Sequence, residues 1–197
     1  MVLKDLVDIA IGSVLSRIPK EKINATSVLP LAIQDVNSHY LIGEKLEQRF
    51  PVMIPNDYLE KAVIAKAGDV VVTLSNPKAL VIEDTFNGYL VPSNMIRIRI
   101  NDLNKLDPYY LSWIIGFSND FAKVIYCNLQ GTTFVKTISV DVLRETDIPL
   151  VPIDEQRKIG KLNELFWKRE SIQEEMKKKR KEAFMALLNS KINNERK

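Results

Sequence analysis

The sequence predicts an α+β domain with a twisted β core and flanking helices, followed by one long C-terminal helix of the coiled-coil type. Up to Pro152, short apolar runs alternate with turn residues. After it, Gly and Pro nearly vanish, and Lys, Glu, Leu, Arg and Gln dominate. We therefore expect a domain at 1–152, a helix at 153–192 and a disordered tail at 193–197.

Several runs in the domain have the composition of β-strands. Residues 70–74 are continuous and β-branched, which favours a buried strand. Residues 79–82 and 95–100 are further strands, and in the second Arg97 and Arg99 alternate with apolar residues and so share one face of a sheet. We also predict a strand at 29–33, followed by a turn at 35–38. An apolar-periodic segment opens the chain and ends near Gly12.

Helix signals follow the strands. Asp107 is suited to cap a helix and Pro108 to occupy its first position, so we predict a helix that ends near Gly116. A second is expected at 119–126, and residues 130–133 are expected to form a loop. Residues 148–152 should be extended, because a residue before Pro avoids the α region.

The C-terminal segment predicts one uninterrupted helix. Asp154 is a suitable cap, and a helix from 155 to 189 would be roughly 50 Å long. Such a helix is too long to lie wholly on a domain of this size. Arg169 and Arg180 interrupt its apolar stripe. We predict that the stripe pairs with a partner helix; the alternative is a helix packed across its own domain. The predicted pairing positions are Ile159, Leu162, Phe166, Ile172, Met176, Ala183 and Leu187.

Charge is distributed unevenly. The chain has a net charge of +3, but residues 154–197 carry 13 Lys and Arg against 8 Asp and Glu, which leaves −2 for the rest. A DNA-binding domain would therefore have to gather its positive charge on one face. The basic run 177–181 surrounds a helix, so it has two interpretations: a solvated face, or a contact with DNA phosphates or with acids of a partner.

The sequence offers little for catalysis. One histidine, His39, and one cysteine, Cys127, cannot make a typical zinc site, and we expect the thiol to be buried. Ser75-Asn76-Pro77-Lys78 lacks the second proline and the aromatic residue of amino-methyltransferase motifs. We therefore predict no enzyme and no cofactor, although an active site of Asp and Glu alone stays open. The acidic start of the chain, the single cysteine and the lack of a long apolar run predict a cytoplasmic protein.

Five segments, in order, resemble the specificity subunit of type I restriction–modification systems. They are Lys66-Ala67-Gly68-Asp69-Val70; Gly88 with Val91-Pro92-Ser93-Asn94-Met95; Leu106-Asp107-Pro108-Tyr109-Tyr110-Leu111; Gln130-Gly131-Thr132-Thr133 with Ile138; and Ile148-Pro149-Leu150-Val151-Pro152-Ile153-Asp154-Glu155-Gln156. The last, a Pro-rich strand followed by Glu-Gln and a long helix, is the most specific.

The resemblance implies a function. A full-length subunit of this family holds two target-recognition domains and two long helices that pack antiparallel, and each domain reads half of a split DNA target. The long helices bind modification (methyltransferase) subunits, and restriction subunits join that complex. The resemblance implies that S-adenosylmethionine, ATP and Mg²⁺ bind only to those partner subunits. This chain has one domain and one helix. It is either a half-subunit that dimerises, and so reads a palindromic split site, or a fragment of a longer protein.

The residues themselves fit a reader of double-stranded DNA. Asn and Gln can pair with adenine, Thr can contact a thymine methyl, and Lys and Arg can contact phosphates or guanine. Each of these residues has a plainer interpretation as a turn former or a solvated side chain. A stand-alone dimeric DNA-binding regulator and a coiled-coil adaptor that binds protein remain as alternative functions. The candidate DNA contacts are Ser75, Asn76, Lys78, Arg97, Arg99, Gln130, Thr132, Thr133 and Lys136.

Overall fold

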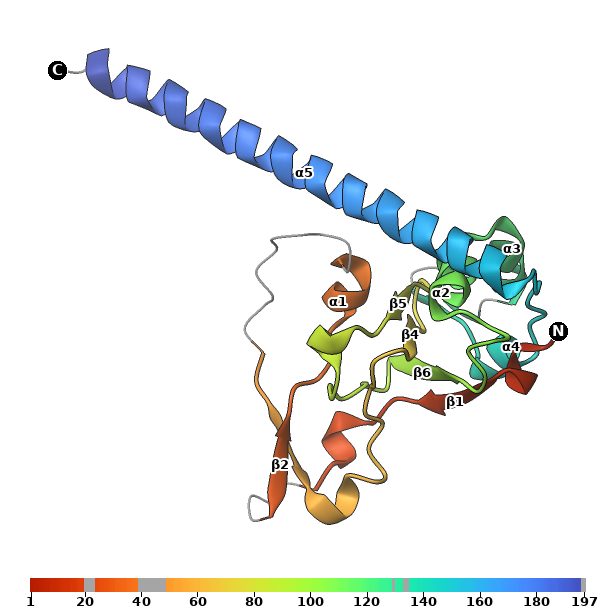
Figure 1. Cartoon of the computed structure of the whole chain (residues 1–197). Coiled ribbons are helices and arrows are strands. Elements are labelled where there is room, and N and C mark those ends of the chain that lie inside the picture. Colours follow the sequence, from red (N-terminus) through yellow and green to blue (C-terminus); the bar gives the residue numbers. More distant parts are fainter. Residues whose placement is uncertain (20–23, 39–48, 129, 133–134, 196–197) are drawn as a thin grey trace.

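The structure, a computed structural model, describes residues 1–19, 24–38, 49–128, 130–132 and 135–195. Its centre is a four-stranded antiparallel sheet in the order β1-β6-β4-β5 (Figure 1). The strands are β1 (Val7–Ile11), β4 (Val70–Thr73), β5 (Ala79–Val81) and β6 (Met95–Ile100). The mixed fold class and the three predicted strands of this sheet are confirmed. The opening segment forms the short 3₁₀ turn η1 (Leu3–Asp5) and then β1.

Apolar side chains bury both faces of this sheet. On one face, Val70, Val72 and Ile98 belong to the main core, which also contains residues of helix α2 (Pro108–Phe117). On the other face, Val71 packs in a second cluster with residues of the segment that leads into α1 (Ile33–Ser38). Burial on both faces explains why the run in β4 is continuously apolar rather than alternating.

Two short strand pairs flank the sheet. β2 (Ala25–Val28) pairs with β3 (Val52–Pro55) around a third, smaller core cluster. β7 (Gln130–Thr132) pairs with β8 (Val135–Thr137). The loop predicted at 130–133 was therefore wrong for 130–132, because these residues find strand partners in 135–137. The remaining 3₁₀ turns are η2 (Leu15–Arg17), η3 (Asn56–Tyr58) and η4 (Asp84–Phe86).

The predicted strand at 29–33 and the turn at 35–38 were wrong. Pro30 makes only an isolated bridge to Leu90, and α1 begins at Ile33. Asp35 fixes the start of α1, because its buried carboxylate accepts a hydrogen bond from the Ala32 N–H at 2.8 Å and pairs with Arg49. A short range of sequence does not reveal this capping, whose second partner lies 14 residues further along.

The middle helices follow the sequence closely. Asp107 caps α2 as predicted, accepting a hydrogen bond from the Tyr110 N–H at 3.0 Å. α3 (Asn119–Asn128) matches the second predicted helix, and α4 (Val140–Arg144) was not predicted. Cys127 is exposed on α3, so the expectation of a buried thiol was wrong. His39 lies outside the described residues.

Helix α5 (Ile153–Glu195) is 43 residues long, or about 65 Å. It begins one residue before Asp154, so Asp154 lies in the first turn and is not the cap. It also continues past 192, so residues 193–195, expected in a disordered tail, are helical. Figure 1 shows α5 leaving the domain beside α2, with its C-terminal end far from the sheet. Within the described residues, no helix combines the length and apolarity needed to span a membrane.

The first turns of α5 are anchored to the domain. The buried Gln156 side chain accepts a hydrogen bond from the Asp107 N–H at 3.0 Å and donates to the carbonyls of Lys105 and Val151 at 2.9 and 2.8 Å. One turn later, α5 crosses α2 at Gly160, where a Cβ atom would lie 2.7 Å from Cβ of Tyr109. These contacts hold the start of α5 against the start of α2.

Candidate nucleic-acid interface

The turn between β4 and β5 presents the first group of predicted contacts. Asn76 has a φ of +48°, in the left-handed region. The buried Thr73 holds the turn closed: its hydroxyl donates to the Asn76 carbonyl at 3.2 Å and accepts from the Lys78 N–H at 3.1 Å. Ser75, Asn76 and Lys78 are left exposed on a turn whose backbone is fixed.

Three chain segments meet at this turn. The Leu74 N–H donates to the Asn94 carbonyl at 3.0 Å, which ties the turn to the loop before β6. The Ile138 N–H donates to the Leu74 carbonyl at 3.1 Å, and Ser75 forms an isolated bridge with Thr137 at the end of β8. We call this assembly of residues 74–78, the loop at 93–94 and the β7–β8 hairpin the recognition edge.

The structure brings most of the predicted contacts to the recognition edge. Ser75, Asn76 and Lys78 are exposed on its turn. The backbones of Gln130, Thr132 and Lys136 lie in the β7–β8 hairpin, which the bridge from Ser75 joins to that turn. Thr133 lies outside the described residues. Segments separated by more than 50 residues in the sequence therefore converge, although contact with DNA stays a prediction for each of them.

Arg97 and Arg99 lie elsewhere, on the strand β6. They share one face of the sheet, as the alternation predicted, while Ile96 and Ile98 are buried on the other. Arg97 pairs with Asp8, and Arg99 donates to both carboxylate oxygens of the buried Asp69 at 2.7 and 2.8 Å. This hydrogen bonding raises the pKa of Arg99 above its ordinary value. Both guanidinium groups already have partners within the domain, which weakens the prediction that they contact DNA.

Two polar residues of the recognition edge were not among the predicted DNA contacts. Ser93 and Asn94 are exposed in the loop before β6. They appeared in the sequence only as a small polar pair before a strand. The link between Asn94 and Leu74 brings them to the predicted contacts, and a single sequence carries no signal of such a link.

The apolar stripe of α5 divides into a packed part and an exposed part. Ile159 packs against the main core of its own domain, so its assignment as a helix-pairing position needs correction. The other predicted positions, Leu162, Phe166, Ile172, Met176, Ala183 and Leu187, are exposed. The exposed large hydrophobic residues of α5 also include Leu165, Phe184, Met185 and Leu188. Apolar exposure of this extent on one helix is typical of a surface that binds a partner.

The junction between the packed and exposed parts carries charged and aromatic contacts. Burial tends to raise the pKa of Glu164, but hydrogen bonds from Lys168 and Lys161, at 2.5 and 3.0 Å, outweigh it and lower the pKa below its ordinary value. The Phe117 ring of α2 lies 4.9 Å from the Trp167 ring of α5. The ion pairs lie within α5, whereas the ring contact joins it to α2 and extends the anchoring of α5 to about its fourth turn.

The basic run at 177–181 is exposed along its whole length. Lys177 pairs with Glu174 at 3.3 Å and Lys179 with Glu175 at 2.7 Å, each on the same helix. Exposed pairs of this kind contribute little to stability. Whether the run contacts DNA stays a prediction.

This fold resembles that of known proteins only in comparisons of structure. No family model matches the sequence, and no curated protein matches it. Among solved structures, the S subunit of a type I restriction–modification system from M. genitalium is 16% identical, with a TM-score of 0.50 over 84% of this chain. The HsdS subunit from Thermoanaerobacter tengcongensis is 17% identical, with a TM-score of 0.51 over 88% of this chain.

A third structure, described as showing complex assembly and conformational transition of the type I restriction–modification system, is 17% identical with a TM-score of 0.51 over 91% of this chain. This chain spans 38 to 42% of the length of the three structures. The resemblance inferred from the motifs is thus confirmed at the level of the fold. The chain has the fold of type I restriction–modification specificity subunits, with one domain of mixed helix and sheet and one long helix.

Proposed function

We propose that this chain recognises a specific sequence of double-stranded DNA as the specificity subunit, or half-subunit, of a type I restriction–modification complex. The observation that carries the proposal is the recognition edge. It joins the exposed polar residues of the turn at 74–78 and the loop at 93–94 to the backbone of the β7–β8 hairpin, in a domain with the fold of specificity subunits. Sequence readers need such polar groups on a fixed backbone, because base edges are distinguished by patterns of donors and acceptors.

Different residues of the recognition edge would contact bases and phosphates. The amide of Asn76 is suited to an adenine, and the hydroxyl of Ser75 to either base of a pair. The Lys78 ammonium is suited to a phosphate, which supplies affinity without sequence information. Gln130, Thr132 and Lys136 would add contacts from the β7–β8 hairpin.

Helix α5 would hold the subunits of the complex together. Its exposed apolar stripe would pair with the helix of a second copy or of another half-subunit, and a two-fold pair would read a palindromic split site. Modification subunits, joined by a restriction subunit, would dock on the assembled helices. In this proposal catalysis, S-adenosylmethionine, ATP and Mg²⁺ belong to those subunits, and the chain acts in the cytoplasm without a cofactor of its own.

Selection from random duplexes tests the proposal. The full chain, alone and with a methyltransferase subunit from its host, is incubated with a randomised duplex library, and the retained molecules are sequenced. A shared motif in two inverted halves supports the proposal. Retained molecules without any shared motif, both with and without the methyltransferase subunit, would contradict it.

Co-purification separates this function from that of a stand-alone DNA-binding regulator. A tagged chain expressed in its host should retain a methyltransferase subunit. A chain that selects a motif but retains no such subunit would favour the regulator.

A further inference from the structure

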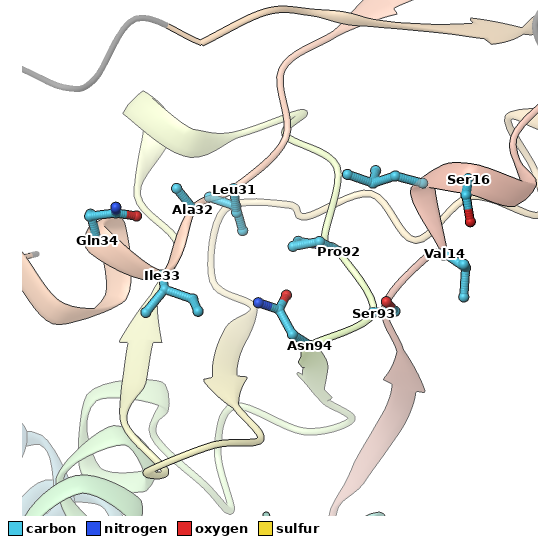
Figure 2. A pocket seen from close by; sticks show the side chains of 10 residues that line it. Val14, Ser16, Leu31, Ala32, Ile33, Gln34, Pro92, Ser93 and Asn94 are labelled. Atoms are coloured by element: carbon cyan, nitrogen blue, oxygen red, sulfur yellow. The ribbon is translucent and has the colours of Figure 1, made fainter. Parts of the chain in front are cut away.

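A groove of about 750 Å³ opens next to the recognition edge. Three segments line it: the turn η2, the start of α1, and the loop before β6. Figure 2 shows the Asn94 amide pointing into the space between Ile33 and Pro92. The lining includes Val14, Leu15, Ile33, Pro92, Ser93 and Asn94.

We propose that this groove, the Asn94 groove, takes an edge of the DNA duplex, and that Asn94 reads a base there. The inference rests on the proposed function and deepens it, because it adds a second contact surface to the recognition edge. Of the candidate contacts that the structure describes, none lies in the lining of this groove.

The Asn94 groove shares the loop at 93–94 with the recognition edge. The Asn94 carbonyl accepts from the Leu74 N–H at 3.0 Å, while its exposed side chain lines the groove. A duplex seated on the turn at 74–78 would therefore meet Asn94 next. Contacts on both sides of Asn94 would let the domain read several adjacent base pairs.

The wall that carries Asn94 is held rigidly. The Gly12 N–H donates to the Met95 carbonyl at 2.9 Å, and the Ser13 N–H donates to the Val91 carbonyl at 2.8 Å. Gly12 itself packs so closely that a Cβ atom would lie 2.0 Å from the Pro92 carbonyl oxygen. A loop fixed in this way loses little conformational entropy on binding, which favours a precise base contact.

The chemistry of the lining matches a DNA edge. None of the described residues that line it is acidic, so a phosphate backbone would meet no repulsion from them. Asn94 offers an amide that can make a bidentate contact with adenine, and the exposed Val14, Leu15 and Ile33 offer apolar contact for a thymine methyl or a sugar. Arg17, exposed at the end of η2 directly after the lining residue Ser16, carries a guanidinium group suited to a phosphate contact.

The test uses a duplex carrying the motif that the wild-type chain selects. Affinity for this duplex is measured for the wild type and for Asn94→Ala, and selection is repeated with the variant. We expect binding to weaken about tenfold, as loss of one bidentate base contact predicts, and the preference at one base position to relax. Asn104→Ala, at an exposed Asn in the loop after β6, is the matched control and should bind as the wild type does.

A second variant tests the groove independently of the Asn94 amide. Ser93→Asp puts a negative charge on the groove wall and should weaken binding to any duplex. Thermal melting checks that each variant folds. Unchanged affinity and motif for both variants would overturn the inference and leave the proposed function standing, whereas a wild type without any motif would defeat the proposed function itself. A groove variant that loses a co-purified protein but keeps its DNA affinity would also overturn it, in favour of a protein partner.

Discussion

The side-chain oxygen of Gln156 accepts a hydrogen bond from the backbone N–H of Asp107 at 3.0 Å, joining the start of α5 to the cap of α2. Asp107 in turn accepts from the Tyr110 N–H, so one chain of hydrogen bonds links both helix starts. Because Gln156 is almost fully buried, water cannot replace its contacts. This relationship sets the direction in which α5 leaves the domain, and in the proposed assembly it would set the distance between two half-sites.

Gln156→Ala should lower the free energy of unfolding by about 3 kcal/mol, since it takes this buried side chain away from one part-buried N–H and two carbonyls. Chemical denaturation measures the change. The control is Gln173→Ala at an exposed position of α5, which should change stability by less than about 0.5 kcal/mol. Equal stability of the two variants would mean that Gln156 does not anchor α5.

Gly160→Ala should destabilise the protein by about 1–3 kcal/mol despite the better helix propensity of Ala, because the new methyl would press on Tyr109 and the Tyr110 backbone. The matched control is Gly116→Ala in α2, where the added Cβ would have no described atom within 4 Å apart from its chain neighbours and the backbone of its own helix, and this change should be neutral or stabilising. Thermal denaturation compares the two. Destabilisation by both, or by neither, would contradict the close crossing of α5 and α2.

Glu164 should make stability depend on pH. Its folded pKa is lowered, so the stability it contributes is full above the ordinary carboxyl value of 4.5 and is lost as the pH falls through the lower folded pKa. The difference in free energy of unfolding between wild type and Glu164→Gln should therefore be present at neutral pH and shrink in acid. Glu174→Gln, at an exposed glutamate paired with Lys177, is the control. A difference for Glu164→Gln that stays constant with pH would argue against the ion pairs.

Lys78→Ala should weaken binding to the selected duplex and reduce the slope of log affinity against log salt by about 1, because one phosphate contact is lost. The control is Lys66→Ala, since Lys66 is exposed near the opposite end of β4. Fluorescence anisotropy over a series of salt concentrations gives both slopes. Identical slopes for the two variants would show that Lys78 does not contact a DNA phosphate.

Ile172→Glu should abolish self-association of the chain, since it places a charge in the exposed apolar stripe of α5. Analytical ultracentrifugation measures the oligomeric state. Leu103→Glu, at another exposed apolar residue in the loop after β6, should leave that state unchanged. A wild-type chain that stays monomeric at all concentrations would contradict pairing of α5 with a second copy. Pairing with the helix of a different half-subunit would then be the remaining alternative.

Local signals predicted much of the fold. The continuous β-branched run of β4, the alternation of β6 and the Asp-Pro start of α2 each depend on neighbouring residues, and each was interpreted correctly. The strand predicted at 29–33 failed because Asp35 pairs with Arg49, a distant residue that local composition does not reveal. The β7–β8 hairpin was missed because its short strands are polar and carry turn residues.

The candidate site was predictable only in its separate pieces. Ser75, Asn76 and Lys78 stood out as turn residues, but their link to Asn94 depends on a backbone hydrogen bond from Leu74. Arg97 and Arg99 looked like free basic residues, because the sequence does not show that Asp8 and Asp69 lie beside them. The sequence did not reveal that Gln156 is buried for the same reason, because two of its three hydrogen-bond partners, Asp107 and Lys105, lie about 50 residues away.

Sequence-specific recognition of DNA is tested most directly by comparing affinities for two duplexes at one physiological salt concentration. One duplex carries the motif that the chain selects, and the other has the same composition in scrambled order. The account predicts that the assembled complex binds the first at least about 10³-fold more tightly, as is typical of specific readers. Equal affinity for the two duplexes would contradict it.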